Sequence, residues 1–156
     1  MKRIITSLIF ITAAYLMTGC SSSKNAAGLK ATTGNLHGTW TITNITTDLP
    51  DTLKVTEVFD EAPYRDFTGS IWELERNGKG SFKLVNGTNE EIYWSIHGKG
   101  DNAQFQFKKL NGMKAKNVED GYRLDLMNIS SNGFVARTPI DIGNGKMAYI
   151  TYTFGK

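Results

Sequence analysis

The sequence is poor in the residues that most often carry chemistry in proteins. One cysteine and two histidines among 156 residues exclude an intramolecular disulfide and disfavour a zinc site built from His and Cys. Prolines number only three, and no apolar run reaches the roughly 20 residues of a membrane-spanning helix. What remains, with 40% hydrophobic and 21% charged residues, is the composition of a globular chain of one domain.

Catalytic motifs are missing as well. A Ser-His-Asp arrangement would have to use His37 or His97, and there is neither a Gly-x-Ser-x-Gly turn nor a glycine-rich loop between a strand and a helix. Glu73 and Glu75 lie two apart on one strand, about 6–7 Å by strand rise, which is near the spacing of a glycosidase pair. Their apolar neighbours occupy the other face, so these glutamates should face water. We expect no enzymatic activity, no catalytic or metal-binding residue and no cofactor.

The first twenty residues have the pattern of a targeting segment. Two basic residues precede the mostly apolar run Ile4–Met17, which is typical of a signal-peptide core. The run ends in Leu16-Met17-Thr18-Gly19-Cys20, which resembles the lipobox of bacterial lipoproteins. This resemblance implies a signal peptide over residues 1–19, cleavage before Cys20 and lipidation of the Cys20 thiol. The alternative, a secretory signal with an incidental cysteine, is disfavoured because the only cysteine stands at this position.

Loss of residues 1–19 would leave the chain almost neutral. Two of the 18 basic residues lie in that segment, which leaves 16 against 15 acidic residues and no case for nucleic-acid binding. Residues 20–35 are mostly small and polar and are predicted to form a flexible tether from the lipid. Ser21 after the cysteine resembles the pattern of lipoproteins sent to the outer membrane, and no acidic run follows. We expect an outer-membrane protein that faces the periplasm.

Residues 36–156 are predicted to form one all-β domain. Alternating runs followed by Gly/Asn turns recur at the spacing of about 8–12 residues that is typical of sandwiches and barrels. Asn and Gly suit such hairpin turns because they adopt positive φ at little cost. The pattern gives eight or nine strands in up-and-down order. Closure into an antiparallel barrel would remove the exposed edges that a long meander otherwise leaves.

The alternation also predicts which side chains face the barrel interior. An eight-stranded barrel is just wide enough to be filled by its own side chains or to hold one small ligand. Both readings stay open at this point. If the interior is open, its ligand-binding lining should be Trp72, Leu74, Phe82, Trp94, Ile96, Phe105, Phe107, Leu124 and Leu126.

The first residues of this domain resemble a known family. Leu36-His37-Gly38-Thr39-Trp40 resembles the Gly-x-Trp opening of the first strand of lipocalins, whose Trp plugs one end of the barrel. With the lipobox, the stretch Gly34–Lys83 resembles the lipocalin-like lipoproteins of Bacteroidetes. The resemblance implies a lipocalin-like calyx with Trp40 as a structural plug. Lipocalins also place an Arg from the last strand over this Trp, and Arg137 is the available candidate here.

Four lysines cluster near the Asn111-Gly112 turn. They either contact anionic headgroups or acidic glycans, or they protect an edge strand from aggregation, and the second reading is favoured. These lysines are Lys108, Lys109, Lys114 and Lys116.

Together these features predict a membrane-anchored, lipocalin-like barrel that binds a small apolar or amphipathic ligand in the cell envelope. The expected partners are the membrane, through acylated Cys20, and this ligand; protein partners are not indicated. The alternative is a protein-interaction or structural module of the envelope with a filled barrel and no ligand. An inhibitor or accessory subunit of a neighbouring enzyme is a third reading.

Overall fold

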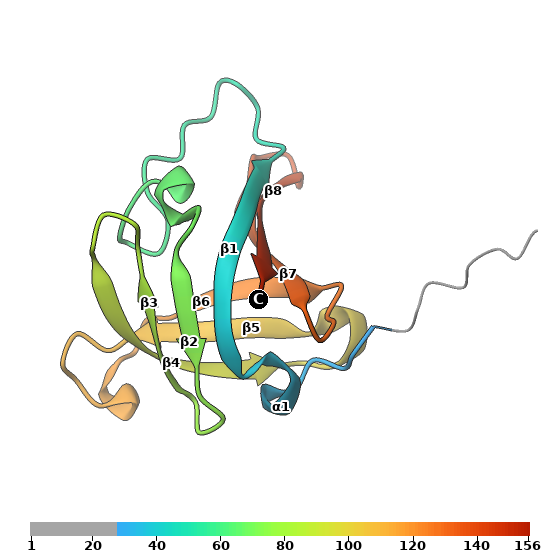
Figure 1. Ribbon diagram of the computed structural model, residues 1–156. Helices are drawn as coiled ribbons and strands as arrows, with labels where there is room; N and C mark the ends of the chain where they lie inside the picture. The colour runs from blue at the N-terminus through green and yellow to red at the C-terminus, as the bar shows by residue number, and fades with distance from the viewer. Residues whose placement is uncertain (1–27) are drawn as a thin grey trace, which may run out of the picture.

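The computed structural model describes residues 28–156, which form a closed antiparallel barrel (Figure 1). Every strand pairs with its neighbours in sequence, and the last strand pairs with the first. This confirms the predicted all-β, lipocalin-like up-and-down barrel and fixes the strand number at eight. The strands are β1 (Gly38–Thr47), β2 (Ile71–Leu74), β3 (Lys79–Lys83), β4 (Asn89–His97), β5 (Gln104–Lys109), β6 (Tyr122–Met127), β7 (Gly133–Asp141) and β8 (Met147–Gly155).

The period-two alternation of the sequence becomes the inside and the outside of the barrel. In β2, Trp72 and Leu74 are buried while Ile71 and Glu73 are exposed. The β2–β3 turn shows why glycine is needed between strands. Gly78 has a φ of +88°, and a Cβ placed there would come within 2.8 Å of the Tyr93 ring.

Within residues 28–156, four short helical elements join or precede the strands: α1 (Thr33–Leu36), η1 (Tyr64–Phe67), η2 (Gly100–Asn102) and η3 (Ala115–Asn117). No helix of residues 28–156 is long and apolar enough to cross a membrane. Of the segment predicted to be a tether, residues 28–35 are described, and they contact the β6–β7 connection before leading into α1. The Leu29 N–H donates to the carbonyl of Ile129 at 2.7 Å. The predicted signal peptide and Cys20 lie outside the described residues.

One end of the barrel, called here the closed end, is sealed by α1 and Trp40. The Trp40 side chain is buried and donates from Nε1 to the carbonyl of Leu36 at 2.7 Å. Its ring meets Phe134 edge-on at 5.0 Å, and the Lys156 ammonium lies 4.6 Å from its centre. Trp40 therefore occupies the position that a plug of the closed end requires.

The cation over Trp40 does not come from Arg137. The inward positions of β7 are taken by Phe134 and Ala136, so Arg137 lies on the outer face of the barrel. There its guanidinium stacks 4.1 Å from the Tyr149 ring centre and lies 3.7 Å from the Asp125 carboxylate. The suggestion that Arg137 covers Trp40 is wrong, and Lys156 has that position.

The opposite end, called here the lidded end, is crossed by the long β1–β2 connection, residues 48–70, at the top of Figure 1. Connections longer than about 12–15 residues are uncommon in compact domains and often serve as lids. The part that folds back over the barrel, residues 58–67, is called here the lid. It contains the Val58–Ala62 bridge and η1.

Candidate functional site

The nine residues predicted to line the interior all lie on strands and occupy the inward positions of their strands. Eight of them are buried and Ile96 is partly buried, packed against the core. Their aromatic rings are in mutual contact: the centre of the Trp72 ring lies 4.8 Å from Phe82 and 5.3 Å from Phe107. These residues are Trp72, Leu74, Phe82, Trp94, Ile96, Phe105, Phe107, Leu124 and Leu126.

The centre of this aromatic cluster is a residue that the strand pattern does not include. Phe59 belongs to the lid, yet only 6% of it is exposed. Its ring enters the barrel at the lidded end and packs among side chains from η1 and several strands. The ring-centre distances are 5.1 Å to Phe107, 5.3 Å to Phe67, 5.4 Å to Tyr122, 5.6 Å to Tyr152 and 6.4 Å to Trp72.

The backbone that carries Phe59 is in an unfavourable conformation. Phe59 has a φ of +58° and Asp60 a φ of +47°, the left-handed region that costs a non-glycine residue about 1 kcal/mol or more. The strain is offset by burial of the ring and by the bridge below it, in which the Val58 N–H donates to Ala62 at 2.9 Å. The tight turn of the lid backbone therefore directs the Phe59 ring into the barrel.

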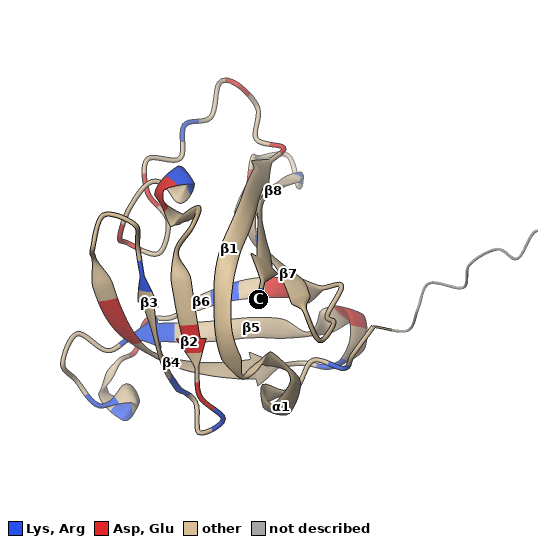
Figure 2. Ribbon diagram, viewed as in Figure 1, with Lys and Arg blue, Asp and Glu red and all other residues tan. Residues whose placement is uncertain are grey.

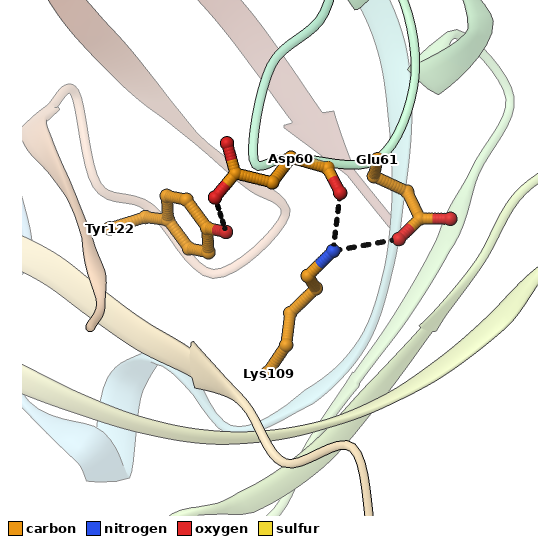
Figure 3. A network of polar contacts seen from close by, with 4 residues as sticks. All are labelled: Asp60, Glu61, Lys109 and Tyr122. Carbon is orange, nitrogen blue, oxygen red and sulfur yellow. Dashed lines mark hydrogen bonds and ion pairs between the residues drawn. The ribbon is translucent and has the colours of Figure 1, made fainter. Parts of the chain in front are cut away.

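Polar contacts fasten the lid to β5 and β6 (Figure 3). The Lys109 ammonium donates to the Asp60 carbonyl at 2.7 Å and to Glu61 Oε2 at 2.9 Å. The Tyr122 hydroxyl donates to Asp60 Oδ2 at 2.8 Å. The side chains of Lys109 and Glu61 are only 12% and 16% exposed, so their ion pair is better shielded from water than a surface pair.

Two tyrosines of this end have perturbed ionisation. Burial, together with the hydrogen bond to Asp60 and its negative charge, raises the pKa of Tyr122 above its ordinary value, so Tyr122 stays a neutral donor. Burial likewise raises the pKa of Tyr152. The Thr138 hydroxyl lies beside the buried Tyr152 hydroxyl and partly offsets this rise.

A hollow opens beside the lid. It measures about 490 Å³ and lies between the lid and the β5–β6 connection, residues 110–121. Its wall includes Lys109 and Tyr122, the two residues that bond to Asp60, so the hollow borders the polar contacts that hold the lid. The lining is Asp60, Lys109, Asn111, Met113, Asn117, Val118, Glu119, Asp120 and Tyr122.

A second hollow, of about 800 Å³, lies on the outer wall of β4–β6, under the same β5–β6 connection. Tyr93 is 40% exposed there, and Gln106 presents a buried side-chain nitrogen without a partner among the described residues. Lys108, Lys116 and Arg123 contribute positive charge, and Glu119 and Asp120 contribute negative charge. This groove is separate from the barrel interior.

The four clustered lysines do not protect an edge strand. The barrel is closed and β5 has partners on both sides, so no edge strand needs protection there. Lys108 donates to the Val118 carbonyl at 2.6 Å and supports the β5–β6 connection, while Lys109 holds the lid. Lys114 and Lys116 are exposed. Figure 2 shows acidic and basic residues intermixed over the barrel in this view rather than gathered by sign.

The two glutamates considered as a catalytic pair lie on the outer surface of the barrel. Glu73 and Glu75 are both exposed, as predicted, and Glu75 accepts a hydrogen bond from Asn77 at 2.9 Å. Residues 28–156 contain no group of three or more His, Cys, Asp and Glu side chains placed to hold a metal ion.

Comparisons with known proteins give no relative: no family model, no curated protein and no solved structure matches this chain. The resemblance to lipocalin-like lipoproteins therefore depends on the sequence motifs and on the barrel topology.

Proposed function

We propose that this protein is a lipid-anchored barrel of the cell envelope that binds a small apolar or amphipathic ligand at its lidded end and catalyses no reaction. One observation carries the proposal. The centre of the interior aromatic cluster is filled by Phe59, a residue of a loop and not of a strand. A loop residue can leave the interior while the strand pairing that defines the barrel stays intact.

The space that Phe59 vacates would be suited to an apolar group. Its neighbours are aromatic rings, and an apolar cavity of about 150 Å³ in a protein interior is enough to hold benzene. A ligand that replaces the ring regains the same burial, worth about 25 cal/mol per Å² of apolar area. The strained backbone at Phe59 and Asp60 lowers the cost of releasing the lid.

The ligand is tested on protein purified from its own host. We expect native mass spectrometry to detect a co-purified small molecule. We also expect titration with apolar compounds to change the fluorescence of Trp72, whose ring lies 6.4 Å from Phe59. A folded Phe59→Ala variant should respond to lower concentrations of these compounds than the unchanged protein does. Absence of a co-purified molecule, together with no response from either protein, contradicts the proposal.

The anchor is tested separately. The lipobox-like ending and the lone cysteine support acylation of Cys20 and an outer-membrane, periplasm-facing location. Cys20→Ser should give a soluble or uncleaved protein in membrane fractionation. A Cys20→Ser protein that is processed and anchored normally rules out the lipoprotein assignment without affecting the ligand proposal.

The second candidate function is a protein-interaction module with a filled barrel. The outer groove on β4–β6 favours it, because Tyr93, which is 40% exposed, offers an aromatic contact there. Crosslinking in cells distinguishes the two functions. If Tyr93→Ala abolishes a specific crosslinked partner and Phe59→Ala does not, the outer groove is the functional surface.

A further inference from the structure

The part of the lid that enters the lidded end has the chemical form of a small amphipathic molecule. Phe59 supplies an apolar ring inside the barrel, and Asp60 and Glu61 supply carboxylates at its rim. Each carboxylate has its own partner on the barrel wall. The Asp60 carboxylate accepts from Tyr122 and the Glu61 carboxylate pairs with Lys109.

Movement of the lid would remove all of these contacts together. Lys109 would lose both Glu61 and the carbonyl of Asp60, and Tyr122 would lose its acceptor. Lys109 is largely buried, so a cation left there without a partner is costly. A ligand with a negatively charged head would restore the pair, whereas a neutral ligand of the same shape would not.

We infer that Phe59-Asp60-Glu61 acts as an internal substitute for the ligand, and that the ligand is an amphipathic anion with a ring-sized apolar group and a carboxylate that binds Lys109. This inference rests on the proposed function, in which the ligand binds at the lidded end. The lid and the ligand then compete for one site. The ligand binds only to the fraction of molecules whose lid is open, which lowers its apparent affinity by that fraction.

Two other carboxylates bear on the role of Lys109. Glu119 and Asp120 line the same hollow as Lys109 and Tyr122. If either of them takes over Lys109 when the lid leaves, the ligand needs no charge. The experiment therefore has to distinguish a ligand carboxylate from Glu119 or Asp120 as the partner of Lys109 when the lid is open.

The experiment uses two probes that differ only in their head groups, 4-phenylbutyrate and 4-phenylbutanol. Their binding to the full-length protein in detergent is measured by isothermal titration calorimetry. In Phe59→Ala the internal ring is absent, so we expect 4-phenylbutyrate to bind about tenfold more tightly than to the unchanged protein. We expect the same variant to bind the acid about tenfold more tightly than the alcohol.

The role of Lys109 is isolated in the Phe59→Ala background. Adding Lys109→Gln should remove the preference for the acid and leave the affinity for the alcohol unchanged. The matched control is Lys114→Gln, which removes an exposed lysine from the same connection and should leave the preference intact. Glu61→Gln keeps Phe59 in place but removes the charge that pairs with Lys109, so it should also strengthen binding of the acid. This variant replaces Phe59→Ala in the experiment if Phe59→Ala does not fold.

The outcomes separate this inference from the proposed function. Equal affinity for the acid and the alcohol in folded Phe59→Ala overturns the anionic ligand and leaves an apolar ligand standing. A preference for the acid that survives Lys109→Gln overturns the role of Lys109. If neither probe binds folded Phe59→Ala or Glu61→Gln, both the inference and the interior binding site are wrong.

Discussion

At the closed end of the barrel a tryptophan of β1 fills the interior, and at the lidded end a phenylalanine of a loop does so. Trp40 is fixed by its own strand, by a backbone acceptor in α1 and by the cation of Lys156. Phe59 is fixed by a left-handed backbone and by side chains that reach across from β5 and β6. The two ends bury rings of similar character, but the first ring belongs to a strand of the barrel itself, while the second belongs to a loop that side-chain contacts hold in place.

The closed end should tolerate truncation least. Trp40→Ala removes a large buried ring from a position that no loop can refill, so we expect a loss of about 3–5 kcal/mol in the free energy of unfolding. Urea denaturation followed by far-ultraviolet circular dichroism measures it. A loss below about 1 kcal/mol would mean that Trp40 does not seal this end.

Truncation of the buried ring at the lidded end should lower the free energy of unfolding by less. We expect Phe59→Ala to cost at least about 1 kcal/mol less than Trp40→Ala, because the lid can relax and the neighbouring hollow admits water. Phe59→Gly should be as stable as Phe59→Ala or more stable, by up to about 1 kcal/mol, since glycine adopts a φ of +58° without strain. The same denaturation assay checks both. Equal losses for Trp40→Ala and Phe59→Ala would remove the distinction between the ends.

A smaller effect should follow from loosening the lid alone. Glu61→Gln removes the charge opposite Lys109, and we expect a loss of about 1 kcal/mol or less in overall stability. Amide hydrogen exchange at residues 58–62 should accelerate about three- to tenfold, while exchange around Trp40 stays unchanged. Asp125→Asn is the control, since its pair with Arg137 is longer and about a third exposed. Uniform acceleration at both ends would show that the lid does not open by itself.

Alkaline pH should affect the lidded end selectively. The folded protein raises the pKa of Tyr122, so it holds this proton more tightly than the unfolded chain does. That contribution to stability is complete below the unfolded value of about 10 and is lost as the pH rises above it. Tyr122→Phe should make the decline in urea midpoint between about pH 9 and 11 shallower, whereas Tyr93→Phe at an exposed site serves as the control. An identical decline in Tyr122→Phe contradicts the expectation.

The barrel can be predicted from the sequence because the patterns that indicate it are local. Alternation places Trp72 and Leu74 on one face whatever the rest of the chain does, and turn residues such as Gly78 mark the strand ends. The lid had no such signal. Residues 48–57 and those around Phe59 show no alternation, and the position of the ring depends on Lys109 and Tyr122.

Those two residues lie 48 and 62 positions along the chain from the carboxylates that they hold. Only the closed barrel brings them together, so a local pattern could not identify the plug of the lidded end. The cation over Trp40 was missed for a related reason. The outward turn of Arg137 follows from the register of β7 and β8, and the reach of Lys156 follows from its position just after the last strand.

The even number of strands sets the orientation of the molecule. After eight antiparallel passes, the chain leaves β8 at the end where it entered β1, and both flanks attach to the same β6–β7 connection. Leu29 bonds to Ile129 at 2.7 Å, and Lys156 bonds to Asn132 at 3.2 Å. Both flanks of the described barrel therefore lie at the closed end, on the side of the molecule opposite the lid.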